Sequence, residues 1–415
     1  MSLAEGVSAR VAVKFYPTGE IAANAQPVSA TDLGAAGGQI LRRVSTTVKL
    51  GKDTYQSNEV RNDRQIADFR HGTKRVSGNI SGELSPLTYA DLFAAVFRAN
   101  WIAPIVLTEA DMTSIAADNA ASTFTFGGGD PVAEGLKVGH VFRNTGLSDV
   151  DDNAANFFIT GFSGPSNRTM HVFPAPDTMV ADTAFVLTTT GKTLSVPSTG
   201  FVKRKAAVEI YNEDIDLARL FTECRFGSFD VKLPASGMST VDFGLMGRNM
   251  EVYEGVAAPF FTGPSPETTT GILAAVNGLL LVNGAVQGVL TSLEIKMDLS
   301  PSADPVVGQN VVPEIFLGRA NVTGSTTAML QDGTLIGNFT DEDEISILAF
   351  LVTTEAVNSP GMAFSLPRIK FSDADVANSG EGGQSITLPF QALKYSGATP
   401  GVPPTTIQIV DTEIV

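Results

Sequence analysis

Apolar and polar positions alternate along most of the chain, which predicts short β-strands rather than long helices. In VSGNISGELS, every second position from Val76 to Leu84 is apolar or glycine, which is the period of a strand with one buried face. The polar positions between them are Ser77, Asn79, Ser81 and Glu83. FGSFDVKLP and STVDFGLMG repeat the alternation as a predicted hairpin, with Asp230 and Asp242 at polar positions. We therefore expect a mainly β fold.

A short helix is predicted after the first of these strands. Ser85 is a candidate N-cap and Pro86 suits the first helical turn. Apolar residues then recur at helical spacing, at Leu87, Ala90, Ala94 and Phe97. We expect this stripe to pack on a sheet and the following Trp101 to be buried in the core.

One pattern occurs twice, far apart in the chain. Its members match at one constant offset, as Gly72, Val76 and Gly78 and then as Gly318, Val322 and Gly324. Each occurrence leads into a stretch that suits a short helix. The parallel resumes in RFGSFDVKLP from Arg225 and RIKFSDADV from Arg368. We infer a duplicated β-rich unit, which suits a symmetric assembly better than a single active site.

The repeat and the breaks between patterns divide the chain into predicted parts. They are an N-terminal strand and arm (1–40), a first unit (41–112 and 200–255), an inserted segment (113–199), a linker (256–273) and a second unit (274–415). The inserted segment should form a small barrel of about five or six strands. We expect the second unit to bypass it with a short loop between Phe350 and Met362.

Residues 56–70 are polar and charged, with little apolar periodicity, as in a long exposed hairpin loop. The loop has too little apolar surface to become ordered by itself. We therefore expect it to be mobile until it binds a partner. Its candidate contact residues are Gln56, Glu59, Arg61, Asp63, Arg64 and Asp68.

Charge and composition exclude several classes of protein. The 415 residues carry a formal charge of −16, which argues against a surface that grips nucleic acid but leaves open a channel that repels it. Cys224 is the single cysteine, so we expect no internal disulfide and assembly in a reducing cytosol. We expect neither a secretory signal nor a membrane anchor, because no apolar run is long and unbroken enough.

The sequence offers little chemistry for catalysis. The histidines are His71, His140 and His171, which are not spaced as a ligand set, and no nucleophile motif occurs. Asp149, Asp151 and Asn153 resemble the opening of a calcium loop, but Ala154 stands at the required glycine. We therefore expect no enzyme activity, no metal and no cofactor.

Several blocks together resemble the tail tube proteins of long-tailed, non-contractile bacteriophages and related prophages. They are YQSNEVRNDRQIADFRHGTKRVSGNISGELSPLTYADLFAAVFRANW, FTECRFGSFDVKLPASGMSTVDFGLMGRNM, PVVGQNVVPEIFLGRANVTG and SLPRIKF. The resemblance spans residues 41–406 and is weakest in the inserted segment.

The resemblance implies a β-sandwich or barrel with a flanking helix, here in two copies, whose inner sheets join around a lumen. On that analogy Ser77, Asn79, Ser81, Glu83, Asp230 and Asp242 would face the lumen. Residues 56–70 would join stacked rings. The implied partners are further copies of the chain, the tape measure, tail terminator and distal tail proteins, and DNA in transit. The protein would assemble in the host cytoplasm and reside in the virion tail.

Two alternatives stay open on the sequence. Two units in each chain favour a trimeric ring over a hexameric one, since barrel size follows the number of strands that join. A β-rich carbohydrate-binding or adhesive module is the competing class, although a content of 8% aromatic residues and one Trp do not favour it.

Overall fold

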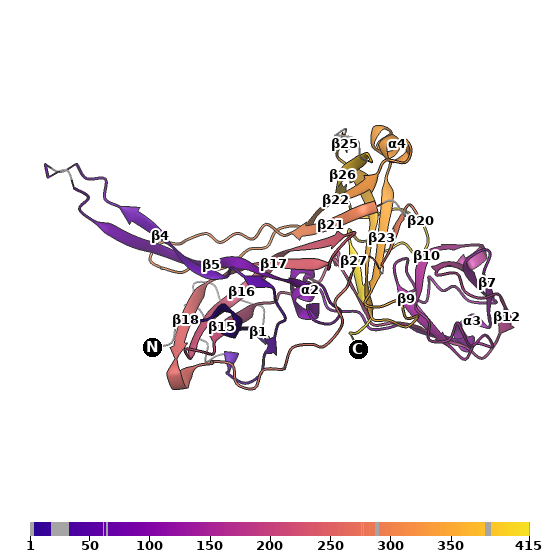
Figure 1. Ribbon diagram of the computed structural model, residues 1–415, viewed down its shortest axis with the longest axis horizontal. Helices are drawn as coiled ribbons and strands as arrows, with labels where there is room; N and C mark the ends of the chain where they lie inside the picture. The colour runs from indigo at the N-terminus through magenta and orange to yellow at the C-terminus, as the bar shows by residue number, and fades with distance from the viewer. Residues whose placement is uncertain are drawn as a thin grey trace.

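The computed structural model describes residues 4–17, 33–60, 62–63, 65–274, 276, 278–286, 290–377 and 383–414. Strands dominate and form a 19-stranded sheet and a separate 8-stranded sheet, which confirms the mainly β class (Figure 1). The α-helices of these residues are short: α2 (Ala90–Phe97), α3 (Glu109–Met112) and α4 (Thr334–Thr340). None of them is long and apolar enough to cross a membrane.

One continuous antiparallel layer, the main sheet, links the N-terminal and C-terminal halves of the chain. Its strands in spatial order are β4 (Lys49–Gln56) continued by β3 (Ser45–Thr46), β5 (Phe69–Glu83), β17 (Thr240–Gly247), β16 (Leu217–Pro234), β21 (Leu290–Asp298), β22 (Asn321–Met329), β26 (Ser385–Ala392) and β25 (Asp375–Ala377). The two halves meet where β16 pairs with β21, from Ser228↔Asp298 to Pro234↔Ser292.

The main sheet has one apolar and one polar face, as period-two alternation dictates. The apolar face is buried in a single core that draws on both halves, with Ile80, Phe229 and Phe243 from the first and Ile295 and Leu388 from the second. The alternation predicted for Val76 to Leu84 and for the β16–β17 hairpin is therefore confirmed.

A second layer covers the apolar face of the first half. It contains β1 (Ala9–Phe15), β2 (Gln39–Ile40), β15 (Ala206–Asn212), the first part of β16 and β18 (Asn249–Glu254). Helix α2 closes this half: Phe93 contacts Phe229 and Phe243, at ring-centroid distances of 5.4 and 5.0 Å. Trp101, predicted to be buried in the core, is partly buried and donates its indole N–H to the carbonyl of Ala90 at 3.0 Å.

The predicted start of this helix is wrong. The helix begins at Ala90 rather than at Ser85-Pro86, and Tyr89 is its N-cap residue. Leu87 has a φ of 67°, a left-handed conformation that an α-helix cannot contain. Its amide is held by the Asp411 carboxylate at 2.7 Å, so a contact with the far end of the chain moves the start of the helix.

The C-terminal half has its own covering layer. It consists of β19 (Gly278–Val282), β20 (Ala285–Val286), β23 (Ile345–Val352), β24 (Gly361–Phe371), β27 (Gln408–Asp411) and β14 (Lys192–Ser195). The end of β24 crosses into the main sheet and pairs with β26 from Ile369 to Phe371. Leu335, Ile336 and Phe339 of α4 pack against the common core.

The inserted segment forms the 8-stranded sheet, with bounds that differ from the predicted 113–199. Its first strand lies before residue 113, and residues 192–195 belong to the covering layer instead. Its strands are β6 (Val106–Thr108), β7 (Ile115–Asp118), β8 (Thr123–Phe126), β9 (Val141–Thr145), β10 (Phe157–Ser163), β11 (Thr169–Phe173), β12 (Met179–Asp182) and β13 (Val186–Thr189). Every strand contributes to one separate core, so the sheet is rolled around it. The expected five or six strands were too few, because strands this short contain too few residues to show a clear alternation of apolar and polar positions.

The inserted domain lies against the covering layer of the C-terminal half (Figure 1). Phe158 stacks on Phe350 at 5.6 Å, and Val138 and Val141 pack against the same layer. The expected bypass at 350–362 is wrong. That stretch is the β23–β24 hairpin, which matches the β15–β16 hairpin, and the point equivalent to the insertion is the short link 341–344 after α4.

Candidate assembly surface

The polar residues singled out in the sequence lie on the polar face of the main sheet. The set is Ser77, Asn79, Ser81, Glu83, Asp230 and Asp242. Ser77 and Asn79 are exposed and the other four are half-buried, whereas the apolar residues between them are buried. The strands place Ser81 opposite Asp242 and Asp242 opposite Asp230. The amide of Asn79 donates to Asp242 Oδ2 at 3.0 Å. The structure thus brings them together, while their position in a lumen stays a prediction.

The polar face continues without a break into the second half. Across the β16–β21 joint, Asp230 is opposite Lys296 and Lys232 is opposite Glu294. Lys232 Nζ lies 3.7 Å from Asp230 Oδ2 and 3.5 Å from Glu294 Oε1. The polar positions that follow on β22 are uncharged: Thr323, Ser325 and Thr327. Sequence reasoning missed these residues, although LEIKMD alternates as clearly as the strands that were used.

The pKa of Asp230 is raised to about 6, mainly by partial burial and to a lesser extent by the nearby Glu294 carboxylate. Asp230 and Glu294 in turn raise the pKa of Lys232. Near neutral pH this stretch therefore holds a cation among carboxylates. A face of hydroxyls, amides and largely compensated charges has little that would bind a phosphate backbone tightly.

The β4–β5 hairpin extends well beyond the body of the molecule (Figure 1). Its strands pair as far as Gln56↔Phe69, so the loop is shorter than the predicted 56–70. Of the candidate contact residues, Arg61 and Arg64 lie outside the described residues, and the others are exposed: Gln56, Glu59, Asp63 and Asp68. Asp68 accepts a hydrogen bond from Arg70 at 2.7 Å, which lowers the pKa of Asp68.

The arm also carries exposed apolar side chains. They are Tyr55, Val60, Ile66 and Phe69, with Val60 101% exposed. An apolar group on a projecting hairpin is a contact surface that the isolated chain does not cover.

The counterpart of this arm in the second half folds back instead of projecting. Residues 299–320 connect β21 to β22 and lie alongside β5, where an isolated bridge joins Lys74 to Val311. Glu314 Oε1 is 2.9 Å from the guanidinium of Arg225, which is 4% exposed. Arg248 donates to the carbonyl of Val312 at 2.7 Å, and the amide of Lys74 donates to Asn310 at 2.8 Å.

Arg248 belongs to a group of buried, ion-paired side chains that no sequence pattern indicated. Glu223 accepts from Arg248 at 2.6 Å and from Lys205 at 3.1 Å, and the Glu223 and Arg248 side chains are fully buried. Glu223 has a φ of 52° where β16 bends between the two layers. Only long-range packing brings these residues together, so no local signal could have revealed them.

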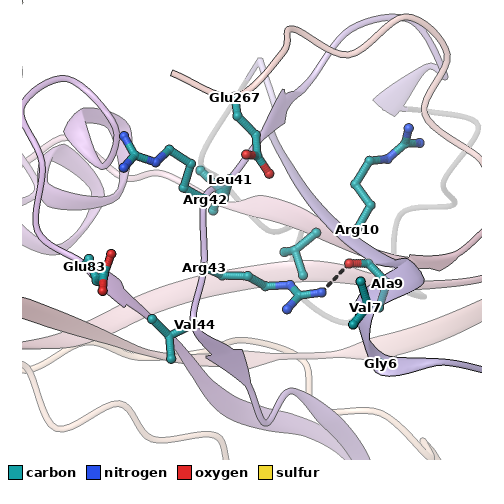
Figure 2. A pocket seen from close by; sticks show the side chains of 11 residues that line it. Gly6, Val7, Ala9, Arg10, Leu41, Arg42, Arg43, Val44, Glu83 and Glu267 are labelled. Carbon is teal, nitrogen blue, oxygen red and sulfur yellow. Dashed lines mark hydrogen bonds between the residues drawn. The ribbon is translucent and has the colours of Figure 1, made fainter. Parts of the chain in front are cut away.

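A polar pocket opens beside the start of β3, at one edge of the main sheet (Figure 2). Arg10, Arg42, Arg43, Glu83 and Glu267 are among the residues that line it, and the three guanidinium groups point in different directions. Arg43 donates to the carbonyl of Ala9, and Arg42 donates to that of Thr270 at 2.6 Å. The pocket thus places three arginines beside two glutamates in a chain that is acidic overall.

The candidate metal residues are only partly brought together. Carboxylates of Asp149 and Asp151 lie within 4.8 Å of each other and of Asp177, whereas Asn153 turns inward and donates to Leu147 and Asp149 carbonyls. Such exposed acidic groups are common without an ion. His140 is buried, and burial lowers its pKa to about 4, so it is a neutral core residue near pH 7.

Comparison with known proteins adds one finding. A family model described as phage tail tube protein matches residues 8–392, a range that includes both halves of the main sheet and the inserted domain. No curated protein gives a significant match.

Proposed function

Since the chain belongs to the phage tail tube protein family, we propose that it assembles with copies of itself into stacked rings that enclose a channel for DNA. The resemblance inferred from the sequence is thereby confirmed, and the protein is a structural component of a phage tail. Such a role gives no reason to assign catalysis to any of its residues.

One observation carries the ring proposal. The main sheet ends at β4 on one side and at β25 on the other, and each pairs with only one neighbour among the described residues. Unpaired edges promote uncontrolled association, and closure into a barrel removes them. A heterologous contact between the two edges would repeat around an axis and close a ring.

The number of chains in the ring follows from the two halves. Both use the same order of pairing: β4, β5, β17 and β16 in the first, then β21, β22, β26 and β25 in the second. We propose that the halves are two copies of one unit, so that a trimer builds a wall with pseudo-sixfold symmetry. A hexamer with the second copy outside is disfavoured, because both copies share the main sheet.

We propose the parts of the chain expected from the sequence, with the inserted domain beginning at β6 rather than at residue 113. They are the arm 1–40, of which 18–32 lies outside the described residues, the first copy (41–112 and 200–255), the inserted domain (113–199), the linker (256–273) and the second copy (274–415). The inserted domain rests on the covering layer of the second copy, so it would decorate the exterior three times per ring.

The polar face would line the channel. A wall rich in hydroxyls, with largely compensated charges, gives the DNA backbone little to bind, which lets DNA pass without adhering. The projecting β4–β5 arm would contact the next ring. The remaining partners we propose are the tape measure, tail terminator and distal tail proteins, with assembly in the host cytoplasm and no membrane anchoring.

The competing sugar-binding function has no observation in its favour. Trp101 is the only Trp, and its indole N–H is engaged with Ala90 rather than offered to a ligand.

The lumen assignment is tested with Ser81→Cys and a bulky thiol reagent. We expect the new cysteine to react in the subunit and to be protected in assembled tubes, because the reagent cannot enter the narrow channel. The native Cys224 is buried, so wild-type protein is the control for background labelling. Equal labelling of Ser81→Cys before and after assembly would reject the lumen position.

A further inference from the structure

The joint between the two halves shows how one copy of the unit pairs with the next. There β16 and β21 are antiparallel, with Asp230 opposite Lys296 and Val231 opposite Ile295. The acid–lysine pair lies on the polar face, and the apolar pair lies in the core. This intrachain joint can serve as a template for the joint between chains.

In the second copy, β25 takes the place that β16 has in the first. Asp375 pairs with Thr387 on β26, as Asp230 pairs with Asp242 on β17. Val376 pairs with Ile386, as Val231 pairs with Val241. Asp375 and Val376 are therefore the equivalents of Asp230 and Val231.

In the first copy, β3 and β4 take the place that β21 has in the second. Lys49 pairs with Ser77 on β5, as Lys296 pairs with Thr323 on β22. Ser45 pairs with Ser81, as Ser292 pairs with Thr327, so the register is the same along the whole edge. Lys49 is therefore the equivalent of Lys296, and Val48 that of Ile295.

We propose that β25 of one chain pairs antiparallel with β3 and β4 of the next, with Asp375 opposite Lys49 and Val376 opposite Val48. This inference rests on the proposed ring and specifies its joint. The register repeats that of the intrachain joint, including the acid–lysine pair on the polar face. Asp373 then lies opposite Gly51, as Ser228 lies opposite Asp298.

The side chains of the two edges support this pairing. Val48 is 4% exposed in the core, and Val376 packs against the same core from the other end of the sheet, so the apolar face would continue across the joint. Asp373 and Asp375 are exposed on the β25 side. The opposite edge carries exposed Lys49 and Lys52, followed by the arginines and glutamates of the pocket in Figure 2.

Lys49 and Lys52 are the exposed cations of this edge. Asp53, the acid on β4, is 2.9 Å from Arg75 of the adjacent strand. A partner edge that brings Asp373 and Asp375 would therefore meet complementary charge, which favours one register and speeds association.

Cysteine pairs test the register in the full-length chain. Lys49→Cys with Asp375→Cys should form disulfides between chains when rings are oxidised, because directly opposite residues bring their Cα atoms within bonding range. Denaturing gels without reductant should then show covalent dimers and trimers. Thr47→Cys with Asp375→Cys, displaced along the strand, should give few, and Asp230→Cys with Lys296→Cys should close within one chain.

The outcomes separate the joint from the ring itself. Rings seen by negative-stain microscopy, with crosslinks at the displaced pair or at neither pair, would overturn the register while leaving ring assembly intact. A protein that never forms rings or tubes would overturn both proposals.

Charge reversal provides a second readout that misfolding cannot imitate. Lys49→Asp and Asp375→Lys should each reduce tube formation at low salt at least tenfold, because each places like charges opposite one another. The double variant should restore assembly toward the wild-type level. Failure of the double variant to improve on either single variant would contradict the Asp375–Lys49 pair.

Discussion

Asp411 illustrates how a single buried carboxyl couples the stability of the fold to pH. It lies in β27, is 1% exposed, and accepts hydrogen bonds from the amides of Leu87 and Glu413. Desolvation outweighs these bonds and raises the pKa of Asp411 to about 7. The folded state therefore holds a proton that the unfolded state has already released near neutral pH.

We predict that Asp411→Asn flattens part of the pH dependence of stability. A raised carboxyl pKa contributes stability that is complete below the unfolded pKa of 3.8 and is lost as pH rises toward 7. The variant loses one acceptor, at a cost of about 1–3 kcal/mol, but its difference from wild type should shrink between pH 4 and 7. Thermal unfolding between pH 4 and 7 measures this difference in stability. Asp343→Asn, at an exposed position, is the control. Parallel pH dependences of wild type and Asp411→Asn would contradict the prediction.

The sequence predicted which face of the sheet a residue lies on only where that depends on the alternation within a single strand. Period-two alternation was enough to place Ser77, Asn79 and Asp242 on the polar face, because a strand turns successive side chains to opposite sides. The buried group of Glu223, Arg248 and Lys205 could not be found that way. Each member is an ordinary charged residue in its own segment, and only the bend of β16 brings them together.

At the scale of elements, the two loops that follow β4 and β21 are equivalent in topology but opposite in behaviour. The loop after β21 is tied down by Glu314, Val312 and Asn310. The hairpin arm after β4 projects, and its Tyr55, Ile66 and Phe69 are exposed. Within the proposed tube, one loop would fix the ring and the other would reach the next ring.

We predict that deleting residues 57–68 leaves a folded subunit that cannot form tubes. None of the described residues of the deleted loop belongs to the common core, so the unfolding temperature should change by only a few degrees. A Gly-Ser turn should replace the loop, and a variant that keeps the arm but carries Val150→Ser at an exposed position of the inserted domain is the control. Microscopy reads out assembly, and tubes of normal length from the deletion variant would contradict the stacking role.

Some secondary-structure elements were predicted from the sequence more accurately than others, because contacts with distant residues decide where certain elements begin. The strand β17 (Thr240–Gly247) was found with nearly the right ends, and the end of β5 at Glu83 was close to the predicted one. The start of β5 was missed, because the strand begins at Phe69, within the predicted loop, rather than at Val76. The start of α2 was misplaced because Leu87 is held by Asp411 from the far end of the chain. The strands of the inserted domain were undercounted because several are only three or four residues long.

For the whole molecule, the acidic charge and the continuous polar face point to the same role. The negative potential of the chain, with its formal charge of −16, suits a wall that DNA passes without binding. The duplicated pattern in the sequence suggested two units, but it could not indicate that they share one sheet. That depends on the β16–β21 pairing, which joins residues with no common motif.

In the proposed tube, each chain supplies two adjacent units of a closed wall. Native mass spectrometry of assembled rings, released from tubes under mild conditions, counts the chains directly. We predict a ring of three chains, each of 43.5 kDa, with the inserted domains at threefold positions in averaged cross-sections. A ring of six chains, with true sixfold symmetry of the inserted domains, would contradict it.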